Sequence, residues 1–254
     1  MTYLKLALIR HAESIGNTQK IMEGQSSTPL SANGLLQAQQ LRDALSTCSI
    51  AHPRSAQRSQ KERSKTEHSK IEHSSFLYSS PLLRAAQTAD ILAEALDHSQ
   101  RRRSSDLQEM HQGIFQGLTW LEAQNQHPQL CKQLLHARNW QPVPQAESPT
   151  TARKRAEAWV NYILHQHHPG ETIWAISHAG IMQQLVAVIL GCDRTWQIPI
   201  HHTARFEFWL SQTHWQTLCA DRFNPEYWIL RRFNDTSHLT ELNAPIAPGA
   251  QAQP

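Results

Sequence analysis

Short apolar segments in this chain alternate with longer segments whose apolar residues repeat at helical spacing. Three apolar segments predict buried strands, at residues 4–9, 75–79 and 172–177. Four segments with helical periodicity predict helices, at residues 31–48, 81–96, 149–166 and 179–190. Strands that alternate with helices in this way predict a three-layer α/β/α sandwich with a mainly parallel central sheet.

The other segments are less regular. Residues 98–105 are polar and predict a connection, and aromatic-rich runs predict further strands at 205–210, 215–220 and 227–232. Between residues 106 and 145, glycines and prolines interrupt the pattern. We expect loops and short helices there, lying over the sheet as a cap-like segment.

The composition changes sharply at residues 51–75, where six Lys or Arg stand against three Glu. This segment carries a charge of +3, equal to the net charge of the whole chain. We expect a disordered, solvated basic insertion there. The proline-containing tail at residues 244–254 is expected to be disordered as well. We expect residues 1–243 to form one domain. A chain of 254 residues is long enough for one large α/β domain with a substantial core.

Composition and charge disfavour several classes of protein. No apolar run approaches the roughly 20 residues of a membrane-spanning helix, and residues 4–9 are too short for a signal-peptide core. We therefore expect a cytoplasmic protein without a membrane partner. Outside residues 51–75 the chain is formally neutral, and one basic loop on a neutral domain argues against nucleic-acid binding. The four cysteines form no CxxC pair, so neither zinc nor a disulfide framework is predicted. Eight tryptophans, several within 196–228, leave room for the apolar contact surface of a homodimer.

Residues suited to phosphate chemistry follow two of the predicted strands. Arg10 and His11 end the first strand, and His178 lies between the strand 172–177 and the helix that begins at Ala179. The carboxyl ends of parallel strands meet at one edge of a sheet, so these side chains should lie close together. A neutral imidazole can attack phosphorus, arginine offers paired donors to phosphate oxygens, and a helix N-terminus favours a bound anion.

Four more residues fit the same edge. Ser14 and Asn17 can add neutral donors, and Arg84 falls in the first turn of a helix just past a strand end. Glu109 can protonate a leaving oxygen and later deprotonate water. Each candidate has a plainer reading: a helix cap for His178, a solvated arginine for Arg84 and a surface carboxylate for Glu109. Their convergence on one rim favours a reactive site.

The segments that contain these residues, and their order along the chain, resemble the motifs of the histidine phosphatase superfamily, in its phosphoglycerate-mutase-like branch. Five segments over about residues 4–239 carry the resemblance: 8–14 with Asn17, 79–89 with Arg84, Glu109 with Gly113 and Gly117, 177–180, and 233–239.

The resemblance implies hydrolysis of a small phosphorylated metabolite without a metal or other cofactor. His11 would attack the phosphoester, and Glu109 would protonate the departing alcohol and then activate water. The phosphoryl oxygens would be held by Arg10, Arg84 and His178. The implied substrate contacts are Arg10, Ser14, Asn17, Glu23, Gly24, Arg84, His178 and Ala179.

The chain departs from the family pattern at two places. Ala12 stands where glycine is most usual. Mutases of the family read Glu-Arg-His-Tyr where this chain reads Glu109-Met110-His111-Gln112, and the paired arginines and tyrosine of the mutase cap are not apparent. We therefore expect a phosphatase. Glu23 would discourage a second acidic group, which hints at monophosphates of neutral alcohols such as sugars or a ribazole-like nucleoside.

Three alternatives remain. A phosphoglycerate mutase is the first, and a non-catalytic protein that uses the basic 51–75 loop to reach an acidic partner is the second. A metal hydrolase built on His11 and His178 is disfavoured, because no Asp-rich cluster accompanies them and the two nearby arginines would repel a cation.

Overall fold

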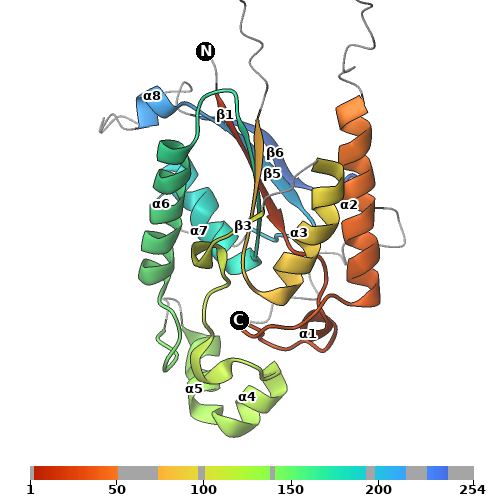
Figure 1. The fold of residues 1–254 in the computed structure, drawn as a ribbon. Coiled ribbons are helices and arrows are strands. Elements are labelled where there is room, and N and C mark those ends of the chain that lie inside the picture. The colour runs from red at the N-terminus through yellow and green to blue at the C-terminus, as the bar shows by residue number, and fades with distance from the viewer. Residues whose placement is uncertain are drawn as a thin grey trace, which may run out of the picture.

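The computed structural model describes residues 3–50, 74–96, 101–137, 141–192, 198–215 and 228–239. A central sheet lies between two layers of helices, with α6 and α7 on one face and α2 and α3 on the other (Figure 1). This is the three-layer α/β/α sandwich predicted from the sequence. Within the described residues, no helix is long and apolar enough to span a membrane.

The sheet has six strands in the order β3-β2-β4-β1-β5-β6. From β3 to β1 the neighbours pair in parallel, whereas β5 is antiparallel to both β1 and β6. The sheet is therefore mainly parallel, as expected. The strand bounds are β1 (Leu4–Arg10), β2 (Ser75–Ser79), β3 (Arg101–Arg103), β4 (Thr172–Ser177), β5 (Arg205–Leu210) and β6 (Trp228–Asp235).

The long helices agree closely with the sequence periodicity, and α6 and α7 have the predicted bounds. Two short 3-10 helices, η1 (Ser105–Leu107) and η2 (Gly113–Phe115), lie between β3 and α4. The α-helices are α1 (Ile15–Thr18), α2 (Ala32–Ile50), α3 (Leu83–Leu96), α4 (Trp120–Gln126), α5 (Pro128–His136), α6 (Pro149–Gln166), α7 (Ala179–Leu190) and α8 (Gln212–Trp215).

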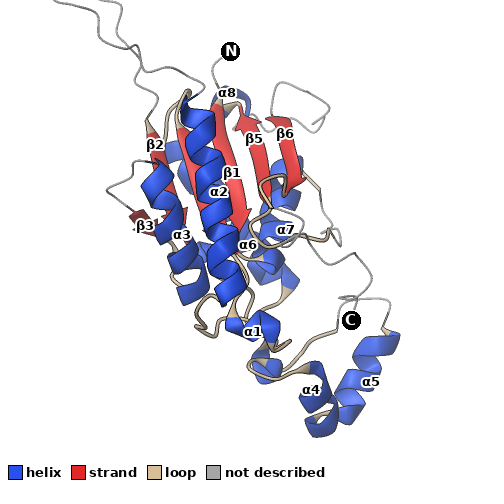
Figure 2. Cartoon of the chain, turned by 90° about the vertical axis from the view of Figure 1, so that its right-hand side faces the viewer, coloured by secondary structure: helices blue, strands red, loops and turns tan. Residues whose placement is uncertain are grey.

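Both faces of the central strands are buried, which is why these strands read as continuous apolar runs. Leu6 and Leu8 pack into the larger core with Trp159 of α6, whereas Ile9 packs on the opposite face with Leu41 of α2. Figure 2 shows α2 and α3 covering that second face. Burial of each large apolar side chain contributes about 1.5–3 kcal/mol, so the two layers hold the strand ends in fixed register.

Three sequence expectations need correction. Residues 98–105 are not only a connection, because Arg101–Arg103 pairs with β2 as a parallel edge strand. Its three arginines are exposed, so no apolar pattern marks it. The helix predicted from Pro81 begins at Leu83. Trp215 ends α8 rather than beginning a strand, and the rest of the 215–220 run lies outside the described residues.

Two other expectations fall on undescribed residues. Of the predicted basic insertion 51–75, only residues 74 and 75 are described, and Ser75 begins β2. Residues 51–73 lie outside the described part of the chain. The predicted disordered tail at 244–254 lies outside it as well. Both remain predictions.

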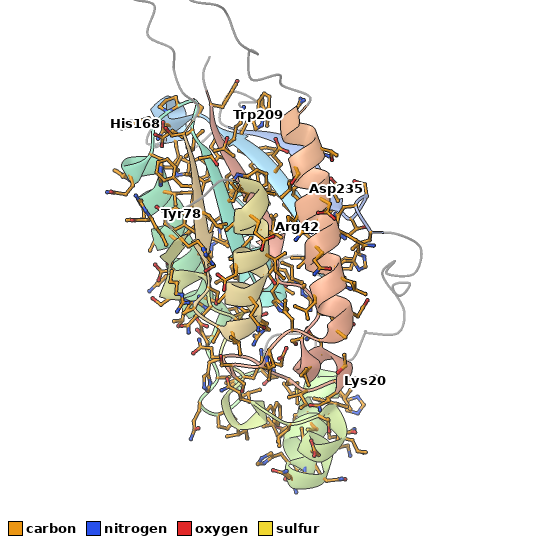
Figure 3. The ribbon with its side chains drawn as sticks, turned by 45° about the vertical axis from the view of Figure 1, so that its right-hand side comes forward. Lys20, Arg42, Tyr78, His168, Trp209 and Asp235 are labelled. Carbon is orange, nitrogen blue, oxygen red and sulfur yellow. The ribbon has the colours of Figure 1, made fainter. Side chains whose placement is uncertain are left out.

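The carboxyl ends of β1, β2 and β4 point toward one end of the molecule, where α1, α4 and α5 lie (Figure 1). In Figure 3, Lys20 marks this end, and His168 and Trp209 lie at the opposite end. The predicted cap-like segment 106–145 contains α4 and α5, which share a small apolar cluster formed by Phe115, Ala123 and Cys131. The candidate chemistry lies between this cluster and the sheet.

Candidate active site

His11 lies directly after β1 and is 3% exposed. Its Nδ1 lies 2.7 Å from the carbonyl oxygen of Ala12. A carbonyl oxygen can only accept, so Nδ1 carries the proton and Nε2 keeps its lone pair. Burial, with the nearby charges of Arg10 and Arg84, holds the pKa of His11 well below its ordinary value. The imidazole is therefore neutral, with Nε2 available as a nucleophile.

Arg84 fixes the other side of that nitrogen. It is 1% exposed in the first turn of α3, and its Nε donates to His11 Nε2 at 3.3 Å. Its Nη1 and Nη2 donate to the carbonyl oxygens of Ser26 and Gly24, at 2.6 and 2.8 Å. Burial lowers the pKa of Arg84, while Glu23 opposes this effect. Arg84 is thus a rigidly held cation beside the nucleophile, not a solvated surface arginine.

Arg10 supplies a second cation from the last residue of β1. Its Nη1 donates to the carbonyl oxygen of Ile200 at 2.6 Å, while its buried Nε has no partner among the described residues. Burial lowers the pKa of Arg10 to about 10, so the side chain stays charged near neutral pH. A buried N–H without a partner is costly, and an anionic oxygen would satisfy it.

His178 occupies the N-cap position of α7 and is fully buried. Its ring centroid lies 4.9 Å from that of His11, and its Nε2 lies 2.8 Å from Ser80 Oγ. Its side chain makes no capping hydrogen bond, and its buried Nδ1 has no partner among the described residues. Burial, with Arg84 and Arg10, holds the pKa of His178 well below its ordinary value. A role as a simple helix cap does not account for this arrangement.

Glu109 reaches the same rim from the loop after η1. Its Oε1 accepts from the backbone N–H groups of Met110 at 2.8 Å and Ile181 at 3.1 Å, and its Oε2 accepts from Gly180 at 3.0 Å. The carboxylate therefore lies at the N-terminus of α7, where backbone donors favour an anion. Oε1 has both lone pairs engaged, which leaves Oε2 with capacity for a proton.

The absence of a side chain at Gly180 leaves room for the carboxylate of Glu109. A Cβ there would lie 2.5 Å from Glu109 Oε1. Any larger residue would have to displace the carboxylate. The sequence Ser177-His178-Ala179-Gly180 therefore places a histidine and the space for an acid on the same helix N-terminus. Ala179, the first residue of α7, separates the two.

Ser14 and Asn17 lie near the pocket, but their side chains are engaged within the protein. Ser14 Oγ and Asn17 Nδ2 both donate to Glu23 Oε2, at 2.7 and 3.0 Å. Thr28 Oγ1 also donates to Glu23, which lies 3.7 Å from Arg84 Nε. Glu23 is 6% exposed, so it serves as a buried counter-charge that orders these donors. Their predicted direct contact with substrate stays a prediction.

His202 belongs to this cluster and was missed in the sequence. Its ring centroid lies 5.9 Å from that of His11, and its Nε2 lies 3.0 Å from Asn17 Oδ1. Burial holds the pKa of His202 well below its ordinary value, so this ring is neutral too. The available signal was the His201-His202 pair just before an apolar strand, because β5 begins at the rim where its antiparallel neighbour β1 ends.

The assembled site can hold an anion between two arginines and two histidines, with a carboxylate at its edge. Arg10 and Arg84 supply two positive charges, and the carboxylate of Glu23 lies beside Arg84 as a counter-charge. Across the described residues, no group of three or more His, Cys, Asp or Glu is placed to hold a metal ion. The geometry brings together the predicted residues Arg10, His11, Arg84, Glu109 and His178.

Comparison with known families agrees with this geometry. The model of the histidine phosphatase superfamily (branch 1) matches residues 6–63 and 58–222, which is most of the chain. The chain is 28% identical to phosphoglycerate mutase-like protein 4 of Arabidopsis thaliana, covering 94% of this chain and 88% of the relative. It is 24% identical to the Proteus mirabilis protein named "Probable phosphoglycerate mutase GpmB", and the alignment covers 94% of this chain and 96% of that relative.

Solved structures share the fold at lower identity. The alpha-ribazole phosphatase from Shigella flexneri aligns with a TM-score of 0.66 at 20% identity, covering 92% of this chain and 97% of that one. Phosphoserine phosphatase from Entamoeba histolytica, in complex with 3-phosphoglyceric acid, aligns with a TM-score of 0.66 at 20% identity, covering 93% and 100%. A mycobacterial glucosyl-3-phosphoglycerate phosphatase aligns with a TM-score of 0.62 at 21% identity, covering 91% and 98%.

Proposed function

Because this chain belongs to the histidine phosphatase superfamily (branch 1), we propose that it is a metal-independent phosphomonoesterase acting through a phosphohistidine on His11. The observation that carries the proposal is the state of His11. Its Nδ1–H is committed to the Ala12 carbonyl, and its Nε2 lone pair lies beside Arg84, in a pocket whose arginines attract phosphate. This is a nucleophile prepared for an anionic substrate.

The first step transfers the phosphoryl group to the enzyme. His11 Nε2 forms a bond to phosphorus as the bond between phosphorus and the alcohol oxygen breaks. The departing oxygen takes a proton from Glu109, whose Oε2 has the free capacity for one. Arg10, Arg84 and His178 offer donors to the phosphoryl oxygens, and such a fixed set of donors is usually the largest catalytic contribution.

The second step returns the enzyme to its starting state. Glu109, now a carboxylate, takes a proton from water as the water oxygen bonds to phosphorus. The bond between phosphorus and Nε2 breaks, and inorganic phosphate leaves. Glu109 therefore acts as an acid in the first step and as a base in the second, which requires its carboxyl group to stay in one place through both.

The substrate class follows from the charge in the pocket. When the substrate binds, Glu109 carries the proton that it later donates, so the two arginines are opposed by the buried carboxylate of Glu23. This balance suits one phosphate better than a bisphosphate. Several structural neighbours are named as phosphatases of small metabolites. Of these names, alpha-ribazole phosphatase fits the charge balance, because phosphoserine and glucosyl-3-phosphoglycerate each carry a carboxylate. We assign this chain a small monophosphate whose alcohol has no second acidic group near the phosphate.

The test is direct. The purified protein is incubated with para-nitrophenyl phosphate in the presence of a chelator, and inorganic phosphate is measured. Phosphate release by the wild type and its loss in His11→Ala are the expected results. Undiminished turnover in His11→Ala would refute the proposal. A panel of phosphorylated metabolites, assayed in the same way, would identify the alcohol.

A phosphoglycerate mutase is the second candidate, because both relatives described above carry names that refer to this enzyme. Against it, Met110 packs against the larger core, and Gln112 Nε2 faces the carbonyl of Met110 at 3.4 Å. Neither residue supplies the cation that would grip a carboxylate. Incubation with 3-phosphoglycerate and a 2,3-bisphosphoglycerate primer separates the two, because only a mutase interconverts the isomers without net release of phosphate.

A further inference from the structure

Arg155 of α6 satisfies the backbone of the loop that delivers Glu109. Its Nη1 donates to the carbonyl oxygens of Asp106 at 2.6 Å and Gln108 at 2.8 Å, with Ser105 at 3.4 Å. Ser105 O also accepts from the backbone N–H of Gln108 at 3.0 Å, whereas Asp106 O and Gln108 O accept no backbone hydrogen bond within the described residues. Since an unsatisfied buried carbonyl is costly, the position of the guanidinium decides the path of the chain into Glu109.

The other two loop carbonyls are also held by side chains. Leu107 O accepts from Ser177 Oγ at 2.8 Å, and Glu109 O accepts from Gln25 Nε2 at 3.0 Å. Ser177 immediately precedes His178, so this contact fixes the loop to the phosphate-binding side of the pocket. Arg155 provides the link to α6, which packs beside α7 on the same face of the sheet.

Arg155 is itself fixed by a bidentate ion pair with Glu147. Nε and Nη2 lie 3.0 and 2.8 Å from the two carboxylate oxygens, and the side chains are only 17% and 11% exposed. The backbone N–H of Glu147 donates to His111 O at 2.9 Å. The pair therefore holds the chain at Gln108, before Glu109, and at His111, after it.

This arrangement requires arginine. Two edges of one planar guanidinium are used at once, one for a carboxylate and one for carbonyl groups. A lysine ammonium is a point charge and cannot serve both edges in this geometry. Because the pair is largely shielded from solvent, its hydrogen bonds are stronger than those of a surface ion pair.

We propose that the Arg155–Glu147 ion pair is a positioning device for Glu109, which keeps Glu109 Oε2 where it must donate a proton to the departing oxygen. Within the described residues, neither residue contacts His11, Arg10 or Arg84. The charge of Arg155 also helps to lower the pKa of His178, but a change in that effect should alter turnover of both substrates in the test below. The inference rests on the proposed function and adds two residues to it.

The test uses kcat/KM, which covers the reaction up to departure of the alcohol and excludes the later hydrolysis. Two substrates are compared: para-nitrophenyl phosphate, whose phenolate leaves without protonation, and glycerol phosphate, whose alkoxide needs a proton. For Arg155→Ala and Glu147→Gln, kcat/KM should fall about 10–100-fold on glycerol phosphate, the size expected of a small misplacement, and less than about 3-fold on the aryl ester. Lys154→Ala, an exposed neighbour on the same helix, is the control and should match the wild type on both.

A double-mutant cycle separates positioning from general damage. In Glu109→Gln, the further change Arg155→Ala should cost almost nothing on glycerol phosphate, because the group that it positions no longer carries an acidic proton. Guanidinium added to Arg155→Ala should restore part of the alkyl activity. Glu147→Gln keeps the same side-chain shape and provides the answer if Arg155→Ala does not fold.

Equal losses on both substrates, full additivity with Glu109→Gln, or no loss at all would each overturn the inference while the wild type still releases phosphate. No phosphate release by the wild type from either ester would overturn the proposed function, and the inference with it.

Discussion

At the scale of single residues, the site depends on which nitrogen or oxygen atoms are left free. His11 keeps Nε2 unprotonated because Nδ1–H is committed to a backbone carbonyl, and this nitrogen accepts only the 3.3 Å hydrogen bond from Arg84 Nε within the described residues. Glu109 keeps one acceptor site on Oε2 because three backbone N–H groups occupy the others. Arg10 Nε and His178 Nδ1 are buried without partners among the described residues. These free groups surround one position, which an anion with several oxygens would fill.

Gly180→Ala tests the placement of Glu109. The added Cβ would lie 2.5 Å from Oε1 and push the carboxylate off the N-terminus of α7. We expect kcat/KM on an alkyl phosphate to fall by about 10–100-fold, with inorganic phosphate still binding as in the wild type. Steady-state kinetics and a phosphate-inhibition constant measure both. Unchanged turnover of the alkyl ester would show that Glu109 need not lie where the structure has it.

Gly16→Ala is the matched change on the phosphate side. Its Cβ would overlap the end of the Glu23 side chain, and Glu23 pairs with Arg84. We expect this variant to bind phosphate more weakly, with an inhibition constant about 10-fold higher than that of the wild type. The reason is that a displaced Glu23 moves the guanidinium of Arg84, which faces His11. If phosphate inhibits this variant as it inhibits the wild type, Glu23 does not hold Arg84 in place.

Sequence patterns identified most of these residues for a simple reason. Arg10, His11 and His178 each follow a short apolar strand of a parallel sheet, and such strand ends meet at one rim. His202 escaped because it precedes a strand, and a rule about the ends of parallel strands does not cover the start of an antiparallel one. Glu23, by contrast, was noticed as a candidate substrate contact. The sequence could not show that it takes the hydrogen bonds of Ser14 and Asn17.

At the scale of elements, the start of β5 is fixed by the segment that follows β6. Thr203 adopts the left-handed region with φ 56°, which is strained for a β-branched residue. Its hydroxyl lies 2.8 Å from His238 Nε2, and its N–H donates to Arg10 O at 3.1 Å. Burial alone would raise the pKa of Asp235, but hydrogen bonds from Ser237 and Arg205 bring it well below the ordinary value. The end of β6 thus fixes the turn behind Arg10.

Stability should depend on pH through His238. Burial lowers its pKa to about 4, so between its unfolded value of about 6.5 and this folded value only the unfolded chain binds the proton. The free energy of unfolding therefore falls as pH falls through that window. His238→Gln keeps a donor for Thr203 without titrating, so denaturant melts should show a shallower pH slope than the wild type. Other histidines with lowered pKa values contribute equally to both proteins, and equal slopes would rule out the assignment.

Element boundaries were predicted where apolar periodicity is strong and missed where it is weak. The bounds of β2, β4, α6 and α7 follow the sequence closely because each has a buried stripe or run. The strand β3 consists of three exposed arginines. It is held by backbone pairing to β2, by an ion pair between Arg101 and Asp90, and by the contact of Arg102 with Tyr78. Pairing of that kind depends on tertiary context, which no local pattern contains.

At the scale of the whole molecule, one rim of the sheet collects residues from five separate stretches of chain. These stretches are 10–30, 80–88, 105–112, 177–181 and 200–203. None of these five stretches includes the basic segment between α2 and β2, most of which lies outside the described residues. Replacing residues 52–72 with a neutral Gly-Ser linker of equal length should therefore leave kcat/KM for para-nitrophenyl phosphate within about 2-fold of the wild type, in line with the small effect of loop changes on stability. A large loss would place this segment in the reaction and revive a functional role for its charge.

The central claim is that His11 carries the phosphoryl group and that water finally accepts it. The most direct measurement is rapid-quench mass spectrometry of the protein mixed with a phosphomonoester, alongside His11→Ala and a count of the inorganic phosphate released. We expect an acid-labile phosphate on His11 that forms and decays at rates matching turnover, its absence in His11→Ala, and one phosphate released per alcohol. Turnover without a phosphorylated His11, or phosphate found on another residue, would contradict the account.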